Sequence, residues 1–98
     1  MKALLFEPGK APADLTMTDN LYTLQKLVDG YIEIINLDDS TVLICNEEGK
    51  IIGLPQNMKI PHDILCGTII VVGVDGDEFS DIPIDFQEWK QLVKEWGN

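Results

Sequence analysis

YIEIINLDDSTVLICNEEGKIIGL, residues 31–54, holds two or three runs of strand-forming residues joined by two acidic turns. The middle run, Thr41–Cys45, is β-branched and apolar, which predicts an interior strand buried on both faces. Asp38-Asp39-Ser40 is typical of a turn, because these short side chains bond to their own backbone. The second turn offers Gly49 for a positive φ and leads to a third strand, Ile51–Leu54. The stretch therefore predicts two successive antiparallel hairpins.

The residues before this stretch predict a hairpin followed by a helix. Lys2–Phe6 and Ala13–Thr18 read as two strands joined by a loop, and Pro12 blunts the outer edge of the second strand. Asp19 or Asn20 is expected to cap a helix that ends at Asp29-Gly30. Four apolar residues fall on one face of this helix, which should pack on the sheet: Leu21, Leu24, Leu27 and Val28.

The C-terminal half predicts one more buried strand and a second helix. Pro55–His62 contains two prolines and reads as irregular, Ile69–Val72 reads as a buried strand, and Gly73–Glu78 reads as a turn. Gly67, just ahead of the strand, suggests a bulge or a close approach of backbone. Asp85 and Glu88 have the spacing of a capping box.

The second helix carries both tryptophans of the chain. Ile84 and Trp89 have the spacing of a hydrophobic staple, and four aromatic or branched residues follow at helical spacing: Phe86, Trp89, Val93 and Trp96. We expect this face to dock into the core, with a stacking platform or a dimer face as the alternative. The whole chain, residues 1–98, is predicted to be one α+β domain. Its fold would be a mostly antiparallel sheet of five or six strands with two helices, the second C-terminal and Trp-rich.

The composition is strongly acidic. The chain has 17 Asp plus Glu against 7 Lys, no Arg, and a formal net charge of -10. Such a charge repels phosphate backbones, and Arg is the usual reader of phosphate and guanine, so direct nucleic-acid binding is not expected. The acids are spread along the sequence, which is more typical of solubility than of a nucleic-acid mimic.

Neither a membrane segment nor a metal motif is present in the sequence. The apolar run at the N-terminus ends at Glu7, too early for a signal peptide or a span. Cys45 and Cys66 lie in apolar surroundings and are expected to be free buried thiols, without the spacing of a zinc site. We therefore expect a soluble cytoplasmic protein with no cofactor and no metal.

Catalytic chemistry finds little support in the pattern. The only histidine, His62, lies between Pro61 and Asp63 in a predicted loop, without an activated nucleophile beside it. Glu47-Glu48 sits in a turn, which is normally solvated, and acid–base chemistry by a carboxyl needs a desolvated site. The Asp-x-Asp fragment at Asp75 lacks the later ligands of a calcium loop. We expect a protein that is not an enzyme.

Five segments together resemble a small domain family of unknown function encoded by phages and mobile elements of Gram-positive bacteria. They are KALLFEPGK (2–10), LQKLVDGYIEI (24–34), VLICNEEGK (42–50), GLPQN (53–57) and CGTIIVVG (66–73). Family members commonly have a longer segment, often with Arg, between the last two pieces. This chain departs from that pattern, because its segment is short and has Met58-Lys59.

The resemblance implies a setting more than an activity. Small non-enzymatic phage proteins often counter host defence, and one class sequesters nucleotide-derived immune signals between subunits. We therefore expect a homo-oligomer that binds a nucleotide-like molecule. The alternative is an acidic protein–protein inhibitor or nucleic-acid mimic acting on a host enzyme. The polar, glycine-bearing interruptions of the sheet are the candidate ligand-binding positions: Asn46, Glu48, Lys50, Pro55, Asn57, Lys59, Gly67 and Thr68.

Overall fold

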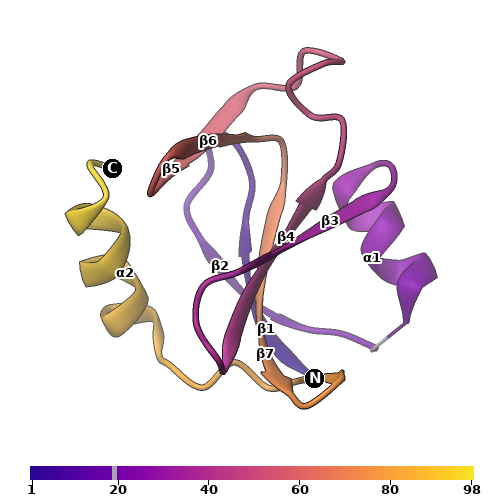
Figure 1. The fold of residues 1–98 in the computed structure, drawn as a ribbon, viewed down its shortest axis with the longest axis vertical. Coiled ribbons are helices and arrows are strands. Elements are labelled where there is room, and N and C mark those ends of the chain that lie inside the picture. The colour runs from indigo at the N-terminus through magenta and orange to yellow at the C-terminus, as the bar shows by residue number, and fades with distance from the viewer. Residues whose placement is uncertain (19) are drawn as a thin grey trace.

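A central antiparallel sheet of six strands forms the body of the molecule (Figure 1). The computed structural model describes residues 1–18 and 20–98. The strand order is β2-β1-β7-β4-β3. In addition, β8 pairs with residues 73–75 at the C-terminal end of β7, past the residues of β7 that pair with β1. The bounds are β1 (Lys2–Phe6), β2 (Ala13–Thr16), β3 (Ile32–Asn36), β4 (Thr41–Asn46), β7 (Ile69–Asp75) and β8 (Glu78–Ser80). The predicted α+β class and the predicted strand number are confirmed.

The two central strands, β4 and β7, carry the core. All six residues of β4 are buried, as are the first five of β7. Continuous apolar runs such as Thr41–Cys45 suit this position, because both faces of a central strand are covered. The prediction of an interior strand at Thr41–Cys45 is confirmed, and so is its hairpin with β3.

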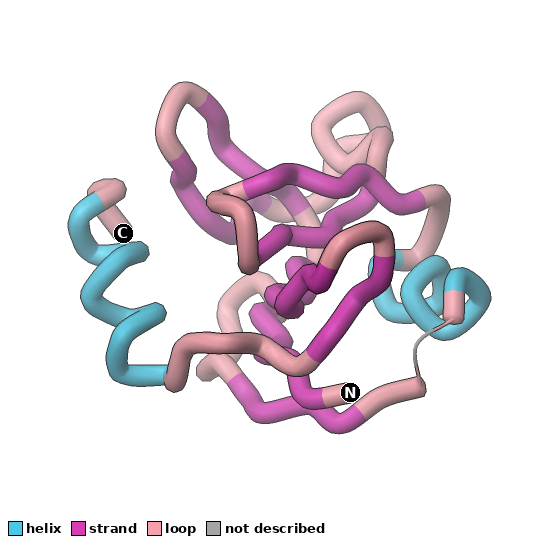
Figure 2. The backbone as a smooth tube through the Cα atoms, turned by 60° about the horizontal axis from the view of Figure 1, so that its bottom comes forward, coloured by secondary structure: helices cyan, strands magenta, loops and turns pink. Residues whose placement is uncertain are grey.

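Each face of the sheet has its own apolar cluster and its own cover (Figures 1 and 2). Helix α1 (Leu21–Val28) packs on one face, against side chains such as Ile44 and Ile70. Helix α2 (Phe86–Glu95) and a separate hairpin of β5 (Gln56–Ile60) and β6 (Asp63–Cys66) cover the other face. The two helices thus lie on opposite sides of the sheet.

The second predicted hairpin of the opening stretch is wrong. Residues 47–55 form a compact loop in which backbone bonds run from Ile52 N to Glu48 O and from Leu54 N to Gly49 O. Gly49 does not have the expected positive φ. A Cβ at this position would lie 2.9 Å from the carbonyl oxygen of Cys66, so glycine is needed here for a close approach of two backbones.

The segment expected to be irregular contains a strand. Pro55 and Pro61 flank β5 without interrupting it, which is consistent with the lack of a backbone N–H in proline. His62 follows in the turn of the β5–β6 hairpin with φ 69. The predicted turn at Gly73–Glu78 is also too long, because β7 continues to Asp75 and only residues 76–77 make the turn to β8.

The predicted helix caps are largely confirmed. The side chain of Asn20 accepts a bond from Thr23 N at 2.8 Å, while the alternative cap, Asp19, lies outside the described residues. At the other end of α1, Asp29 takes the left-handed conformation that was expected of Gly30. Leu21 does not join the apolar stripe and is 55% exposed.

Helix α2 begins as its sequence predicts. Asp85 accepts a bond from Glu88 N at 2.8 Å, and Trp89 is completely buried. The ring of Trp89 lies 5.7 Å from the rings of both Phe6 and Trp96, measured between centroids. For Trp89, docking into the core is therefore confirmed.

Candidate functional site

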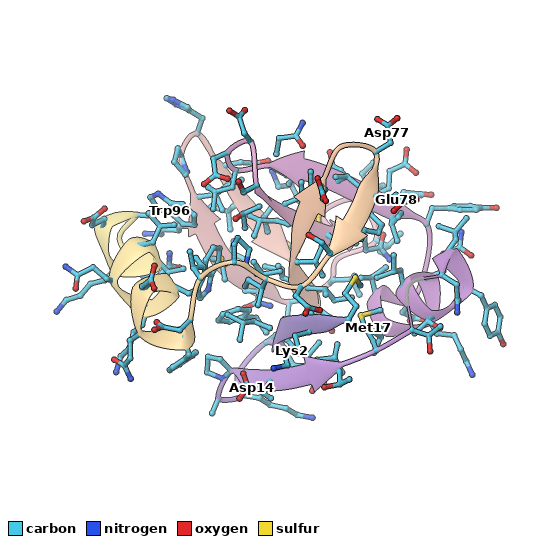
Figure 3. All side chains as sticks on the ribbon, turned by 90° about the horizontal axis from the view of Figure 1, so that it is seen from below. Lys2, Asp14, Met17, Asp77, Glu78 and Trp96 are labelled. Carbon is cyan, nitrogen blue, oxygen red and sulfur yellow. The ribbon has the colours of Figure 1, made fainter. Side chains whose placement is uncertain are left out.

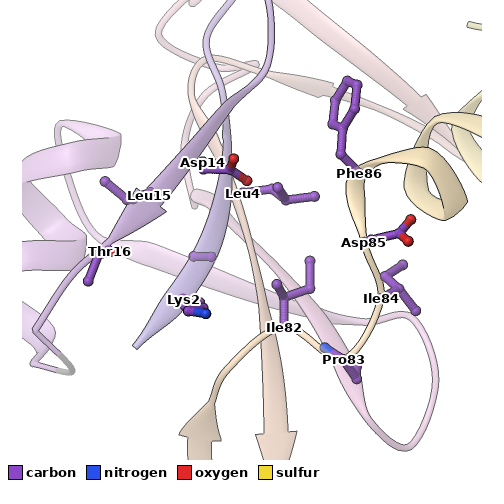
Figure 4. Close-up of a pocket in the computed structure, with 11 residues that line it drawn as sticks. Lys2, Leu4, Asp14, Leu15, Thr16, Ile82, Pro83, Ile84, Asp85 and Phe86 are labelled. Atoms are coloured by element: carbon purple, nitrogen blue, oxygen red, sulfur yellow. The ribbon is translucent and has the colours of Figure 1, made fainter.

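A hollow lies between the β1–β2 hairpin and the segment that leads into α2 (Figure 4). We call it the β1–α2 groove, and its volume is about 630 Å³. Its lining is mainly apolar with a few polar groups at the sides: Lys2, Ala3, Leu4, Asp14, Leu15, Thr16, Ile82, Pro83, Ile84, Asp85 and Phe86.

Strand alternation explains the side of the groove formed by the sheet. Register pairs Lys2 with Thr16 and Leu4 with Asp14, so these four side chains share one face of the hairpin. The opposite side is the 82–86 segment, which is held at the start of β1 by two bonds. Lys2 N donates to Asp81 Oδ1 at 2.7 Å, and Ile82 N donates to Lys2 O at 2.9 Å.

Charge around the groove is negative on balance. The carboxylates of Asp14 and Asp85 and the ammonium group of Lys2 are its charged groups. A second acidic region lies at the end of the sheet, where Val74 N bonds to Ser40 O at 2.8 Å. This contact brings the Asp38-Asp39 turn beside the β7–β8 hairpin, whose Asp77 and Glu78 extend from the molecule (Figure 3).

Asn46, one of the predicted ligand positions, is engaged by the protein itself. Its side-chain amide donates to Val28 O and to Asp29 O, each at 3.1 Å, and its carbonyl oxygen accepts from Glu48 N at 2.7 Å. The residue is buried and ties the end of α1 to β4. Glu48, another predicted ligand position, takes part in this network through its backbone N–H.

Lys50 lies at a smaller hollow of about 230 Å³ between the β3–β4 hairpin and β6, which we call the Cys45 hollow. Its ammonium group forms an ion pair with the carboxylate of Asp63. That bond raises the pKa of Lys50 and lowers the pKa of Asp63. Glu33 and Glu47 also line the hollow, which makes its surroundings acidic.

Three other predicted positions meet at a third hollow. Pro55, Gly67 and Thr68 line a volume of about 300 Å³ beside the end of α1. Gly67 has φ +82, which favours glycine, and a Cβ there would lie 2.8 Å from Leu54 Cδ1, a side-chain atom and not the backbone contact that was expected. The loop of residues 47–55 contributes to both this hollow and the Cys45 hollow.

The last two predicted positions lie apart from these hollows. Asn57 donates through its side chain to Phe6 O at 2.8 Å and to Gly67 O at 2.7 Å, which joins β5 to the main sheet. Lys59 exchanges backbone bonds with the side chain of Asn98, near the C-terminus. The eight residues are therefore not gathered into one pocket, and their role in binding stays a prediction.

Cys45 forms part of the floor of the Cys45 hollow as a free thiol. Its Sγ donates to Glu33 Oε1 at 3.8 Å. Burial, reinforced by the Glu33 carboxylate, raises the pKa of the Cys45 thiol to about 12 from an ordinary 9.0. A thiol is nucleophilic only as the thiolate, so Cys45 is not poised for nucleophilic chemistry at neutral pH.

We expect Cys45 to resist alkylation by iodoacetamide at pH 8 in the folded protein and to react readily in denaturant. The same shift makes the fold sensitive to alkali: the stability contributed by the neutral thiol is complete below pH 9.0 and is lost as pH rises toward 12. Site-resolved mass spectrometry measures the first effect, and urea midpoints at pH 8 and pH 10 measure the second. Rapid labelling of Cys45 without denaturant would contradict the assignment.

Sequence reasoning missed the β1–α2 groove. Its two sides come from residues 2–16 and 82–86, and no local pattern joins segments so far apart. Within residues 1–18 and 20–98, no cluster of three or more His, Cys, Asp or Glu side chains could hold a metal ion. No helix among these residues is long and apolar enough to cross a membrane.

Comparison with known proteins places the chain in a family. A family model described as a domain of unknown function, DUF3846, matches residues 1–96. The chain belongs to the DUF3846 family. The match covers nearly all of this DUF3846 chain, including both sides of the groove and the β5–β6 hairpin. Neither a curated protein nor a solved structure matches it.

Proposed function

We propose that this protein is a non-enzymatic binding protein whose β1–α2 groove receives an apolar and basic segment of a partner protein. The observation that carries the proposal is the combination of an apolar lining with carboxylates at its sides, in a chain of net charge -10. Apolar lining supplies affinity, and a few charged groups supply orientation and choice of partner.

The size of the groove suits a few side chains. A volume of about 630 Å³ lies within the range of about 300–1,000 Å³ typical of binding pockets. Leu4 forms the sheet side, while Ile84 and Phe86 stand opposite (Figure 4). An apolar side chain entering between them would leave water, and each buried methylene contributes about 0.8 kcal/mol.

The charges around the hollows favour a basic partner over a phosphorylated ligand. The groove has two carboxylates and one ammonium group, and in the Cys45 hollow the only lysine is paired with Asp63. A phosphate placed at either position would meet like charge, whereas Lys or Arg of a partner would meet Asp14 and Asp85. The acidic end of the sheet would add long-range attraction for the same partner.

The phage setting implied by the sequence resemblance gives this proposal a context. In that setting the partner would be a host protein of the cytoplasm, and a basic nucleic-acid-binding enzyme offers the complementary charge. Sequestration of a nucleotide-derived signal is the competing proposal. It would require a phosphate site that the observed charges do not favour.

Binding can be tested with an array of short synthetic peptides that vary independently in charge and hydropathy. We expect basic, apolar peptides to bind, and NMR shifts of Leu4, Ile84 and Phe86 to report them. The Asp14→Lys variant should bind several-fold more weakly, mainly through slower association, because Asp14 is an exposed group at the side of the groove. Glu95→Lys changes net charge equally at the exposed far end of α2 and serves as the control.

A panel of nucleotides measured by the same NMR method separates the two proposals. Nucleotide binding with no response to basic peptides would overturn the protein-partner proposal and support sequestration. Equal weakening by Asp14→Lys and Glu95→Lys would show that net charge alone attracts the peptides and that the groove is not their site.

A further inference from the structure

The two outer strands of the main sheet differ in how their open edges are protected. β2 follows Pro12, which lacks a backbone N–H and discourages pairing with another strand. β3 contains neither proline nor lysine, and its register with β4 is regular over all five residues. Within residues 1–18 and 20–98, no strand covers the outer edge of β3.

The register identifies which backbone groups of β3 point outward. Glu47 N donates to Tyr31 O, and Leu37 N donates to Thr41 O, so the odd-numbered residues of β3 bond to β4. In an antiparallel ladder the alternate residues face the other way. The N–H and C=O groups of Ile32, Ile34 and Asn36 are therefore directed to the open edge.

Apolar side chains accompany this open backbone. Ile34, in the middle of the strand, is 47% exposed, and Tyr31 at its start is 68% exposed. Natural proteins tend to avoid a regular edge that has exposed apolar side chains and no proline, lysine or bulge, unless another strand covers it. The feature thus calls for a partner strand.

We propose that the β3 edge pairs antiparallel with β3 of a second copy, so that two sheets join into one across a twofold axis at Ile34. The pattern is self-complementary: with Ile34 opposite Ile34 of the second copy, Ile32 faces Asn36 of that copy. Each of the three residues whose backbone groups point outward then pairs with a residue whose backbone groups also point outward. This gives up to six backbone hydrogen bonds, because each of the three residue pairs can exchange two.

The same register suits the charges. Glu33 is the only charged residue of β3, and it would face Ile35 of the second copy, so the two carboxylates are not directly opposite. A net charge of -10 on each copy still opposes association over longer distances. Added salt should therefore strengthen the dimer by screening this repulsion.

In such a dimer, the Cys45 hollow would lie next to the second copy. Glu33 lines that hollow from β3 itself, so the hollow opens next to the proposed twofold axis. The second copy would lie beside this opening and could contribute to it. The inference does not depend on the β1–α2 groove, which lies at the opposite outer strand of the sheet.

Sedimentation velocity over a range of protein concentrations tests the association. We expect a monomer–dimer equilibrium that Ile34→Lys weakens about tenfold or more, because the substitution places two ammonium groups together at the axis. Gln91→Lys makes the same change of charge on the exposed surface of α2 and should leave the equilibrium unchanged.

Amide hydrogen exchange locates the contact and contains its own reference. The amides of Ile32, Ile34 and Asn36 should exchange more slowly as the protein concentration, and with it the fraction of dimer, rises. The amides of Glu33 and Ile35 bond to β4 in either state and should be protected throughout. A monomer at every concentration, or a dimer in which the first three amides exchange rapidly, would overturn the proposal.

Discussion

Replacing Trp89 by alanine is expected to lower the free energy of unfolding by roughly 3–5 kcal/mol, the usual cost of removing a large aromatic side chain from a core. Trp89 is 0% exposed and is one of the largest fully buried side chains among the described residues. It joins Phe6 of β1 to Trp96 at the end of α2. Its loss would therefore open a cavity between the sheet and the helix.

Urea denaturation followed by circular dichroism measures this effect, because the signal does not depend on the tryptophan that is removed. Trp89→Phe should cost clearly less, since it keeps a ring and removes an indole Nε1–H that has no hydrogen-bond partner among the described residues. Leu21→Ala, on the exposed side of α1, is a control with little expected effect. A loss of stability for Trp89→Ala as small as that of Leu21→Ala would mean that α2 does not dock as described.

Local sequence patterns predict the parts of this fold whose causes are local. The Asp85 cap, the β3–β4 hairpin and the buried run in β4 all follow from neighbouring residues, and all are observed. The prediction of a strand at Ile51–Leu54 is wrong, because a short apolar run resembles a strand whether it lies in a sheet or in a loop. Here Ile51 is 83% exposed in a loop closed by short-range backbone bonds.

The site was harder to predict because it depends on distant residues. Glycine-bearing turns pointed to Asn46, but its amide is satisfied by the end of α1, 17 and 18 residues earlier in the chain. The groove requires that the segment of Pro83 reach the start of β1, where two bonds hold it: Lys2 N to Asp81 Oδ1 and Ile82 N to Lys2 O. Side-chain type alone does not encode such a contact.

A different test applies to Asn46, whose substitution by aspartate keeps the shape of the side chain and changes only its chemistry. The amide donates to two backbone oxygens, Val28 O and Asp29 O. A carboxylate cannot donate, and it would place a negative charge against both oxygens in a buried position. We expect Asn46→Asp to cost roughly 3–5 kcal/mol at pH 7, as for an uncompensated buried charge.

The pH dependence separates charge from shape in the Asn46→Asp variant. Burial and the two oxygens disfavour the ionised form, so the pKa of the introduced carboxyl should rise in the folded state above its ordinary value of about 3.9. The neutral acid can donate one bond, so the variant should be closest to the wild type at low pH and lose stability relative to it as pH rises from about 4. Urea midpoints of both proteins at pH 4.5 and pH 7 measure the difference. A deficit that is the same at both pH values would show that the variant is destabilised by the loss of the donated amide bonds and not by the buried charge.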